Sequence, residues 1–345
     1  MSSKSPKLED WEKLYQAAVS FKKLKPWEWM YDDDIFGVKS PKTNKIYYCS
    51  IMGSIGEHFG ISAYIGTEGL NGVIRILSGE IEPEDPDAIH IPKCLIASFE
   101  NREMLSEEDR KIIRQLGYKF RGKNEWPLFR IFNPGFLAWY INRDECLLLT
   151  DILTQAIHVA VMCKEDGEIL FQNEKPRAFL VRVPKEKNGI IEWHNEYLEA
   201  APYMPKFSSF YLQDEIKIRK LKQIDRRRGT VWEIDTFFSP APVKDKKIPY
   251  YPKMCLIMDQ TKGLVLNLNM VKDINKEGFK FIDMFIELIE NLKRFPSRVL
   301  VQREETYYLF KKICNQLEIP LEMVDRLQIL DDARYEMYNY LNNRF

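Results

Sequence analysis

Four carboxylates in the last third of this 345-residue chain are of the type that metal-dependent phosphodiester cleavage needs. Asp235 lies within an alternating apolar segment, and Glu304 follows a shorter apolar run. Asp331 and Asp332 stand where a closing helix is expected to begin. Hard divalent cations take oxygen ligands, and two of them about 4 Å apart can activate a water and stabilise the leaving oxygen. We therefore expect Asp235, Glu304 and Asp331 to bind Mg²⁺ or Mn²⁺, and these three with Asp332 to form a catalytic site.

The elements that must position these carboxylates follow a definite order. Alternation of apolar and polar residues, and turn-forming residues between the runs, predict strands at 231–238, 253–259, 263–271, 298–302 and 321–324. An amphipathic helix at about 277–293 separates the third strand from the fourth, a second helix separates the fourth from the fifth, and a third helix closes the chain. The predicted order is three strands, then helix, strand, helix, strand, helix.

This order, over about residues 230–343, resembles that of a ribonuclease H-like domain. An acid that ends the fourth strand, as Glu304 does, is similar to the arrangement in Holliday-junction resolvases. The resemblance implies that the first strand is central and pairs in parallel with the fourth, while the last helix packs across their ends. The four carboxylates would then converge, and the expected function is a nucleic-acid-associated, metal-dependent phosphodiesterase.

Ordinary structural roles are available for the same residues. Asp331 or Asp332 can stabilise exposed backbone N–H groups at a helix start, and Asp235 can anchor a loop by hydrogen bonding. Glu304 can be a solvated turn residue, and its neighbour Arg303 is a cation that can replace a metal ion. The alternative function is therefore a non-catalytic binding or regulatory module that keeps a degenerate ribonuclease H-like fold. A salt bridge from Arg303 into the acidic cluster would favour this alternative.

The densest cluster of cations lies just before this domain, in and after a short predicted helix at 214–223. Its members are Lys217, Arg219, Lys220, Lys222, Arg226, Arg227 and Arg228. Such a cluster can bind a phosphate backbone. The alternative is a solvated linker helix with cations near its C-terminus. The whole chain has 51 basic and 51 acidic residues, so any nucleic-acid partner must use a local patch.

The first half is predicted to be an α+β domain at 1–200, joined by a basic linker helix at 201–229 to the α/β domain at 230–345. Its expected strands are 35–38, 45–52, 59–65, 94–99, 128–132, 168–171, 178–183 and 190–194, and its main helices are 8–24, 67–77, 106–116 and 144–162. Residues 49–53 (CSIMG) match 255–259 (CLIMD), and 68–70 match 277–279 at a similar spacing. The first half is hypothesised to be a diverged copy of the second, with coincidence as the alternative.

Composition narrows the class of protein and its expected location. With 45% hydrophobic residues the chain can bury a sizeable core, and its polar N-terminus has no apolar segment of a signal peptide. No apolar run is expected to approach the roughly 18 residues of a membrane span, so the predicted location is the cytoplasm, with no membrane partner and no identifiable protein partner. The six scattered cysteines indicate buried free thiols. On segments 66–70 (GTEGL) and 251–256 (YPKMCL), the whole chain also resembles an uncharacterised bacterial two-domain family.

Overall fold

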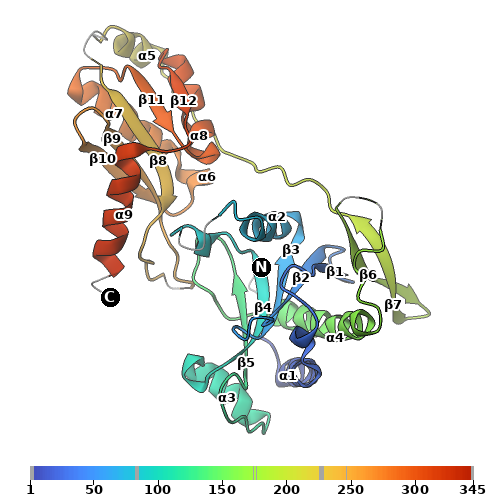
Figure 1. Ribbon diagram of the computed structural model, residues 1–345. Coiled ribbons are helices and arrows are strands. Elements are labelled where there is room, and N and C mark those ends of the chain that lie inside the picture. The colour runs from blue at the N-terminus through green and yellow to red at the C-terminus, as the bar shows by residue number, and fades with distance from the viewer. Residues whose placement is uncertain are drawn as a thin grey trace. The chain divides into compact units, whose positions relative to one another are not determined.

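Two compact units make up the chain in the computed structural model, which describes residues 4–81, 85–173, 175, 177–224, 229–245 and 247–342 (Figure 1). The first unit comprises residues 1–134 and 138–203, and the second comprises 135–137 and 204–345. Each unit has its own mixed sheet, its own helices and its own hydrophobic core. The protein therefore has a two-domain α+β architecture.

The first unit is built on a sheet of seven strands. In spatial order they are β5 (Trp126–Phe132), β4 (Cys94–Glu100), β3 (Gly60–Ile65), β2 (Ile46–Met52), β1 (Phe36–Lys39), β6 (Ala178–Lys187) and β7 (Ile190–Glu199). Strands β1 and β6 are parallel, and every other neighbouring pair is antiparallel. Consecutive strands are mostly neighbours, which is typical of an antiparallel meander.

Helices cover both faces of this sheet, because alternate residues of each strand point to opposite faces. On one face the main core contains Cys49 and Ile51 of β2 together with side chains of α1 (Leu8–Leu24), α3 (Glu107–Gln115) and α4 (Arg143–Glu165). On the other face, Tyr48 packs against Leu70 and Val73 of α2 (Gly66–Leu77). Short 3₁₀ helices span Pro26–Glu28, Ala88–His90 and Arg102–Met104.

Helix α4 corrects one expectation from the sequence. Within the described residues it is the one helix that is long and apolar enough to cross a membrane by length and composition. Half of the residues in its most apolar stretch are buried, and Leu149, Ile152 and Leu153 are fully enclosed in the core of the first unit. Its position against the seven-stranded sheet accounts for the apolar sequence, because a helix in a protein core buries apolar side chains as a membrane helix does.

The second unit has a sheet of five strands. In spatial order they are β10 (Leu264–Val271), β9 (Lys253–Asp259), β8 (Val231–Phe238), β11 (Arg298–Val301) and β12 (Leu321–Met323). Strand β8 is parallel to β11, and β11 is parallel to β12. Strand β9 is antiparallel to both β8 and β10. The predicted central position of the first strand and its parallel pairing with the fourth are confirmed.

Two layers of helix enclose this sheet, as Figure 1 shows. On one face, Trp232 and Ile234 pack with side chains of α7 (Phe279–Leu292) and α8 (Glu304–Gln316), next to the short α6 (Ile274–Glu277). On the other face, Phe237 packs with side chains of α9 (Gln328–Asn342). Leu221 of α5 (Glu215–Lys222) is 1% exposed in the same core as Trp232. Helix α5 is thus packed as part of the second unit.

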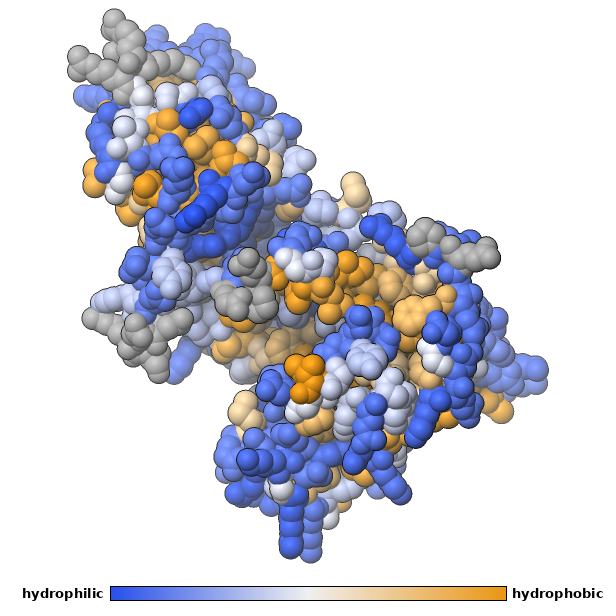
Figure 2. All heavy atoms as spheres, viewed as in Figure 1, coloured by the Kyte–Doolittle hydropathy of each residue, from blue (hydrophilic) through white to orange (hydrophobic). Residues whose placement is uncertain are grey.

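Strand β10 forms one edge of the five-stranded sheet, and its backbone is partly shielded by its own side chains. The amide oxygen of Asn267 accepts a hydrogen bond from the N–H of Leu268 at 2.9 Å, and that of Asn269 accepts one from the N–H of Met270 at 2.7 Å. Leu268 and Met270 are themselves exposed apolar residues. Apolar side chains also reach the surface elsewhere, as the orange areas of Figure 2 show for one face.

The hypothesis that the first unit is a diverged copy of the second is wrong. In the first unit β4 pairs antiparallel with β3, whereas its supposed equivalent β11 pairs parallel with β8. The glycines in the two short matches also serve different contacts. A Cβ at Gly69 would lie 2.7 Å from the carbonyl oxygen of Lys93, just before β4, and one at Gly278 would lie 2.5 Å from the carbonyl oxygen of Ile274 in the preceding helical turn and 2.8 Å from the ring of Phe210. The matches reflect similar strand and turn composition, not shared connectivity.

Candidate functional site

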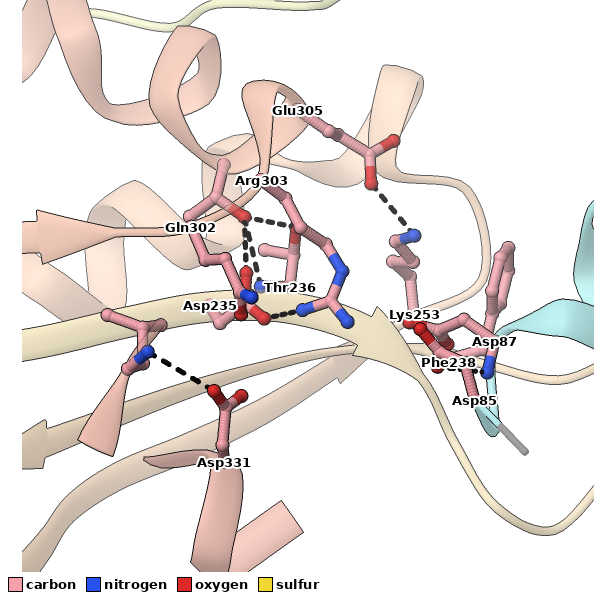
Figure 3. A network of polar contacts seen from close by, with 12 residues as sticks. Asp85, Asp87, Asp235, Thr236, Phe238, Lys253, Gln302, Arg303, Glu305 and Asp331 are labelled. Carbon is pink, nitrogen blue, oxygen red and sulfur yellow. Dashed lines mark hydrogen bonds and ion pairs between the residues drawn. The ribbon is translucent and has the colours of Figure 1, made fainter. Parts of the chain in front are cut away.

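Asp235 is the residue around which the predicted site was built, and it lies in the middle of β8 with a side chain that is 0% exposed. The guanidinium group of Arg303 forms an ion pair with its Oδ2 atom (Figure 3). The hydroxyl of Thr306 donates a hydrogen bond to its Oδ1 atom at 3.1 Å. A buried carboxylate is tolerated when it is paired and hydrogen-bonded, and both conditions hold here.

Thr306 connects the start of α8 to the end of β8. Its Oγ1 atom accepts the backbone N–H of Thr236 at 3.0 Å and lies 2.7 Å from the Thr236 hydroxyl. A threonine hydroxyl has one donor and two acceptor positions. If Thr306 donates to Asp235 and Thr236 supplies the other two protons, every position is used. The first turn of α8 is therefore held against the carboxylate by a complete set of hydrogen bonds.

A second ion pair lies beside the first. The ammonium group of Lys253, at the start of β9, is 2.8 Å from a carboxylate oxygen of Glu305 (Figure 3). The same ammonium group is 4.0 Å from the ring centroid of Phe238, within the range of a cation–π contact. Lys253 is 12% exposed and Glu305 28%, so the pair is largely removed from water. Asp235 and Glu305 thus each have a cation as partner.

The other predicted ligands lie in different surroundings. Glu304 is the first residue of α8 and is exposed. Asp332 is also exposed and forms an ion pair of 3.4 Å with Arg326, in which both side chains are at least 70% exposed. Asp331 accepts a hydrogen bond from the backbone N–H of Leu327 at 3.2 Å and so stabilises the start of α9. Asp331 therefore has the helix-start role of the structural alternative, whereas Asp332 forms only an exposed ion pair.

Glu233 is a buried acid that the sequence did not single out as functional. It is 0% exposed, two positions before Asp235 on the same face of β8. Its Oε2 atom accepts the backbone N–H groups of Ile329 and Leu330 at 3.1 and 2.8 Å, and its Oε1 atom accepts from the side chain of Gln260 at 2.8 Å. A carboxylate at a helix N-terminus satisfies free N–H groups and the helix dipole. Glu233 therefore joins α9 to the central strand.

The predicted metal ligands Asp235, Glu304 and Asp331 lie in different surroundings. Among the residues that the structure describes, no three His, Cys, Asp or Glu side chains are grouped so that they could hold a metal ion. Asp235 faces the guanidinium of Arg303, while Glu304 and Asp332 point into solvent. The physical reason is local: Arg303 is the residue before α8, and its side chain occupies the position beside Asp235 that a cation would take. Asp259, by contrast, is confirmed as a turn former, since its Oδ1 atom accepts the N–H of Lys262 at 3.1 Å.

Three of the four described members of the basic cluster in α5 are paired with acids. Lys217 lies 3.3 Å from Glu290, Arg219 lies 3.8 Å from Glu215, and Lys222 lies 2.6 Å from Glu318. Lys220 is exposed, and Arg226, Arg227 and Arg228 lie outside the described residues. The described part of the cluster is thus a surface of mixed charge, which matches the expected alternative of a solvated helix better than a phosphate-binding stripe.

The cysteines are all free and buried, as predicted. Burial raises the pKa of Cys314 to about 12 and holds the pKa of Cys255 well above its usual range. The thiolate is the reactive form of cysteine. Near neutral pH these two thiols of the second domain therefore stay protonated and behave as small apolar side chains.

Comparison with known families gives one match for each unit. Residues 11–182 match the model of a domain of unknown function (DUF7309), and residues 217–338 match that of another domain of unknown function (DUF6930). No match to a curated protein was found. The first match covers most of the first unit, and the second begins in α5 and ends in α9. The chain thus carries two domains of unknown function in series and fits an uncharacterised two-domain family.

Proposed function

We propose that the second domain is a non-catalytic binding or regulatory module with a degenerate ribonuclease H-like fold. The strand order β10-β9-β8-β11-β12, with β8 parallel to β11 and β9 antiparallel to both its neighbours, supports the fold assignment. So does the placement of α9 over the face of β8 that carries Glu233. Fold alone does not carry function, so the functional proposal rests on the carboxylates.

The observation that carries the proposal is the ion pair between Arg303 and Asp235. In a metal-dependent phosphodiesterase, the position beside the central carboxylate is filled by a divalent cation with further oxygen ligands. Here the guanidinium supplies the positive charge from within the chain, and Thr306 uses the other carboxylate oxygen. An internal cation stabilises the buried acid without any ligand. The residues that would perform metal chemistry thus perform a structural task.

A nucleic-acid partner has weaker support than the binding role itself. Three of the four described cations of the basic cluster have a carboxylate within 4 Å, and the chain has no net charge. Association driven by phosphate contacts requires Lys and Arg side chains that are free to neutralise phosphates and so displace the counterions condensed on the nucleic acid. A protein or peptide partner is therefore the better expectation, and a cytoplasmic location stays a prediction.

Calorimetric titration with Mn²⁺ and Mg²⁺ tests the proposal. We expect no saturable binding by the wild type, and no difference between the wild type and the Asp235→Asn variant, because the site is already neutralised. Single-stranded, duplex and branched nucleic acids incubated with protein and Mn²⁺ should remain intact. Binding of one or two Mn²⁺ ions that Asp235→Asn abolishes, with cleavage lost in parallel, would instead establish the phosphodiesterase.

A further inference from the structure

The stretch at 207–212 has no regular secondary structure, yet its backbone is bound by one side chain of α8. The N–H of Leu212 donates to Oε1 of Gln316 at 3.0 Å, and Nε2 of Gln316 donates to the carbonyl oxygen of Leu212 at 3.0 Å. One amide group thus pairs with both polar atoms of one peptide residue. This is how a neighbouring strand would pair, and it does not depend on the side chain at that position.

The aromatic ring of Phe210 packs into a space that exists because residue 278 is a glycine. A Cβ atom at Gly278 would lie 2.8 Å from Cε2 of Phe210 and 3.0 Å from Cδ1 of Leu309. The ring also lies 6.4 Å from that of Phe279 at 67°, an edge-to-face arrangement. Phe210 and Leu212 both pack against the second core. The space beside Gly278 therefore accommodates an aromatic ring from a segment that is not part of α6, α7 or α8.

Two further contacts continue along the same stretch. The ring of Phe207 stacks on that of Tyr308 with centroids 5.3 Å apart and planes 14° apart. The hydroxyl of Ser208 donates to the side-chain oxygen of Asn275 at 2.9 Å. Anchors at the first, fourth and sixth positions of one extended segment, together with backbone pairing, are the elements by which peptide-recognition domains bind their ligands.

We propose that the surface formed by Asn275, Gly278, Tyr308 and Gln316, here called the α6–α8 groove, is a recognition site for an extended peptide. The ligand has aromatic residues at its first and fourth positions and leucine at its sixth. The chain's own residues 207–212 occupy the groove as a cis-bound strap. The inference supplies a ligand class for the proposed binding role, but it concerns a different surface from Asp235, so either can fail without the other.

Because residues 207–212 already occupy the groove, they compete with any added peptide, and the strength of this competition can be calculated. A segment tethered by a short linker competes at an effective concentration on the order of 1 mM. If a free peptide of this pattern binds an empty groove with Kd of about 10 μM, the ratio of strap-occupied to empty groove is about 100 to 1. A peptide in trans then binds the wild type about 100-fold more weakly than it binds a chain whose strap cannot dock.

The experiment uses the full chain and a fluorescein-labelled peptide with the sequence of residues 204–214, in buffer without divalent metals. Fluorescence anisotropy should show binding to a Phe207→Ser, Phe210→Ser double variant about 100-fold tighter than to the wild type. Adding Gln316→Ala should weaken that binding roughly 10-fold, because two hydrogen bonds of about 1 kcal/mol or less each are lost. Asn315→Ala, on an exposed neighbour in α8, is the matched control and should change nothing.

Circular dichroism establishes whether the double variant is folded. If it is folded and binds no more tightly than the wild type, or if Gln316→Ala and Asn315→Ala behave alike, the groove is only the seat of a connecting segment and the proposal fails. If it is unfolded, the wild type is used at several millimolar unlabelled peptide. Hydrogen exchange at the Leu212 amide should then become faster as the strap is displaced, and an unchanged rate would overturn the proposal.

Discussion

Replacing Arg303 with alanine removes the cation that faces the buried carboxylate of Asp235. Asp235 is 0% exposed and Arg303 only 23%, so water and salt screen the pair little. Removing one partner of a buried pair costs about 3–5 kcal/mol, because the other charge stays buried without compensation. Since Thr306 still donates to Asp235, we expect the lower end, about 3 kcal/mol. Changing Asp235 to Asn in the same background should restore much of the loss by removing the buried charge.

Hydrogen exchange read by mass spectrometry on peptides from β8 and α8 measures this loss within the second domain. Arg298→Ala is the matched control, since Arg298 starts β11 and forms an exposed ion pair of 3.4 Å with Glu322. Exposed pairs contribute about 0–1 kcal/mol, so the control should exchange nearly as the wild type does. Equal effects of Arg303→Ala and Arg298→Ala would refute the assignment of Arg303 as the internal counterion.

Three further predictions concern single features of the two domains. Burial raises the pKa of Asp151 to about 6, above its unfolded value, so stability should fall as pH rises from about 4 to above 6. Asp151→Asn should therefore raise the melting temperature at pH 7 and have no effect near pH 4. A Cβ at Gly60 would lie 2.3 Å from a carbonyl oxygen of β4, whereas one at Gly167 meets nothing within 4 Å. In urea unfolding Gly60→Ala should lose about 2 kcal/mol or more, and Gly167→Ala almost nothing, while equal losses would contradict the close packing. Changing Asn267 and Asn269 to valine removes the groups that occupy the edge N–H groups of β10, so sedimentation velocity should show more self-association than for the wild type. An unchanged sedimentation coefficient at high protein concentration would contradict the shielding role.

Much of the second domain could be predicted because its signals are local. Alternation along 231–238 and 253–259 predicted β8 and β9 with the bounds that the structure has. The turn at Asp259 followed from the residue types that favour turns. The parallel pairing of β8 with β11 was implied by the resemblance of the element order to that of a ribonuclease H-like domain. In the first domain, residues 168–171 were predicted as a strand but form turns, because a short apolar stretch after α4 packs Leu170 into the core without any strand pairing.

The site could not be predicted with the same success, because its contacts depend on geometry across elements. Arg303 and Glu304 are adjacent, yet adjacent residues at a helix start point in different directions, so one faces Asp235 and the other faces solvent. The role of Glu233 depends on where α9 begins relative to β8, which no local pattern specifies. The alternation of β8 did place Glu233 and Asp235 on one face of the sheet, and this was the only sequence feature that indicated a role for Glu233. The supposed duplication failed for the same reason, since strand order is a non-local property.

Whether Asp235 contacts a metal ion or the guanidinium of Arg303 is the most direct test of the proposed role of the second domain. Crystals of the full chain grown or soaked with Mn²⁺, with anomalous scattering recorded, would locate any bound metal independently of activity. We predict no anomalous peak at Asp235 and the guanidinium of Arg303 in contact with its carboxylate. A peak about 2.0–2.6 Å from the Asp235 oxygens, with Arg303 displaced from the carboxylate, would contradict the central claim that this chain supplies its own cation.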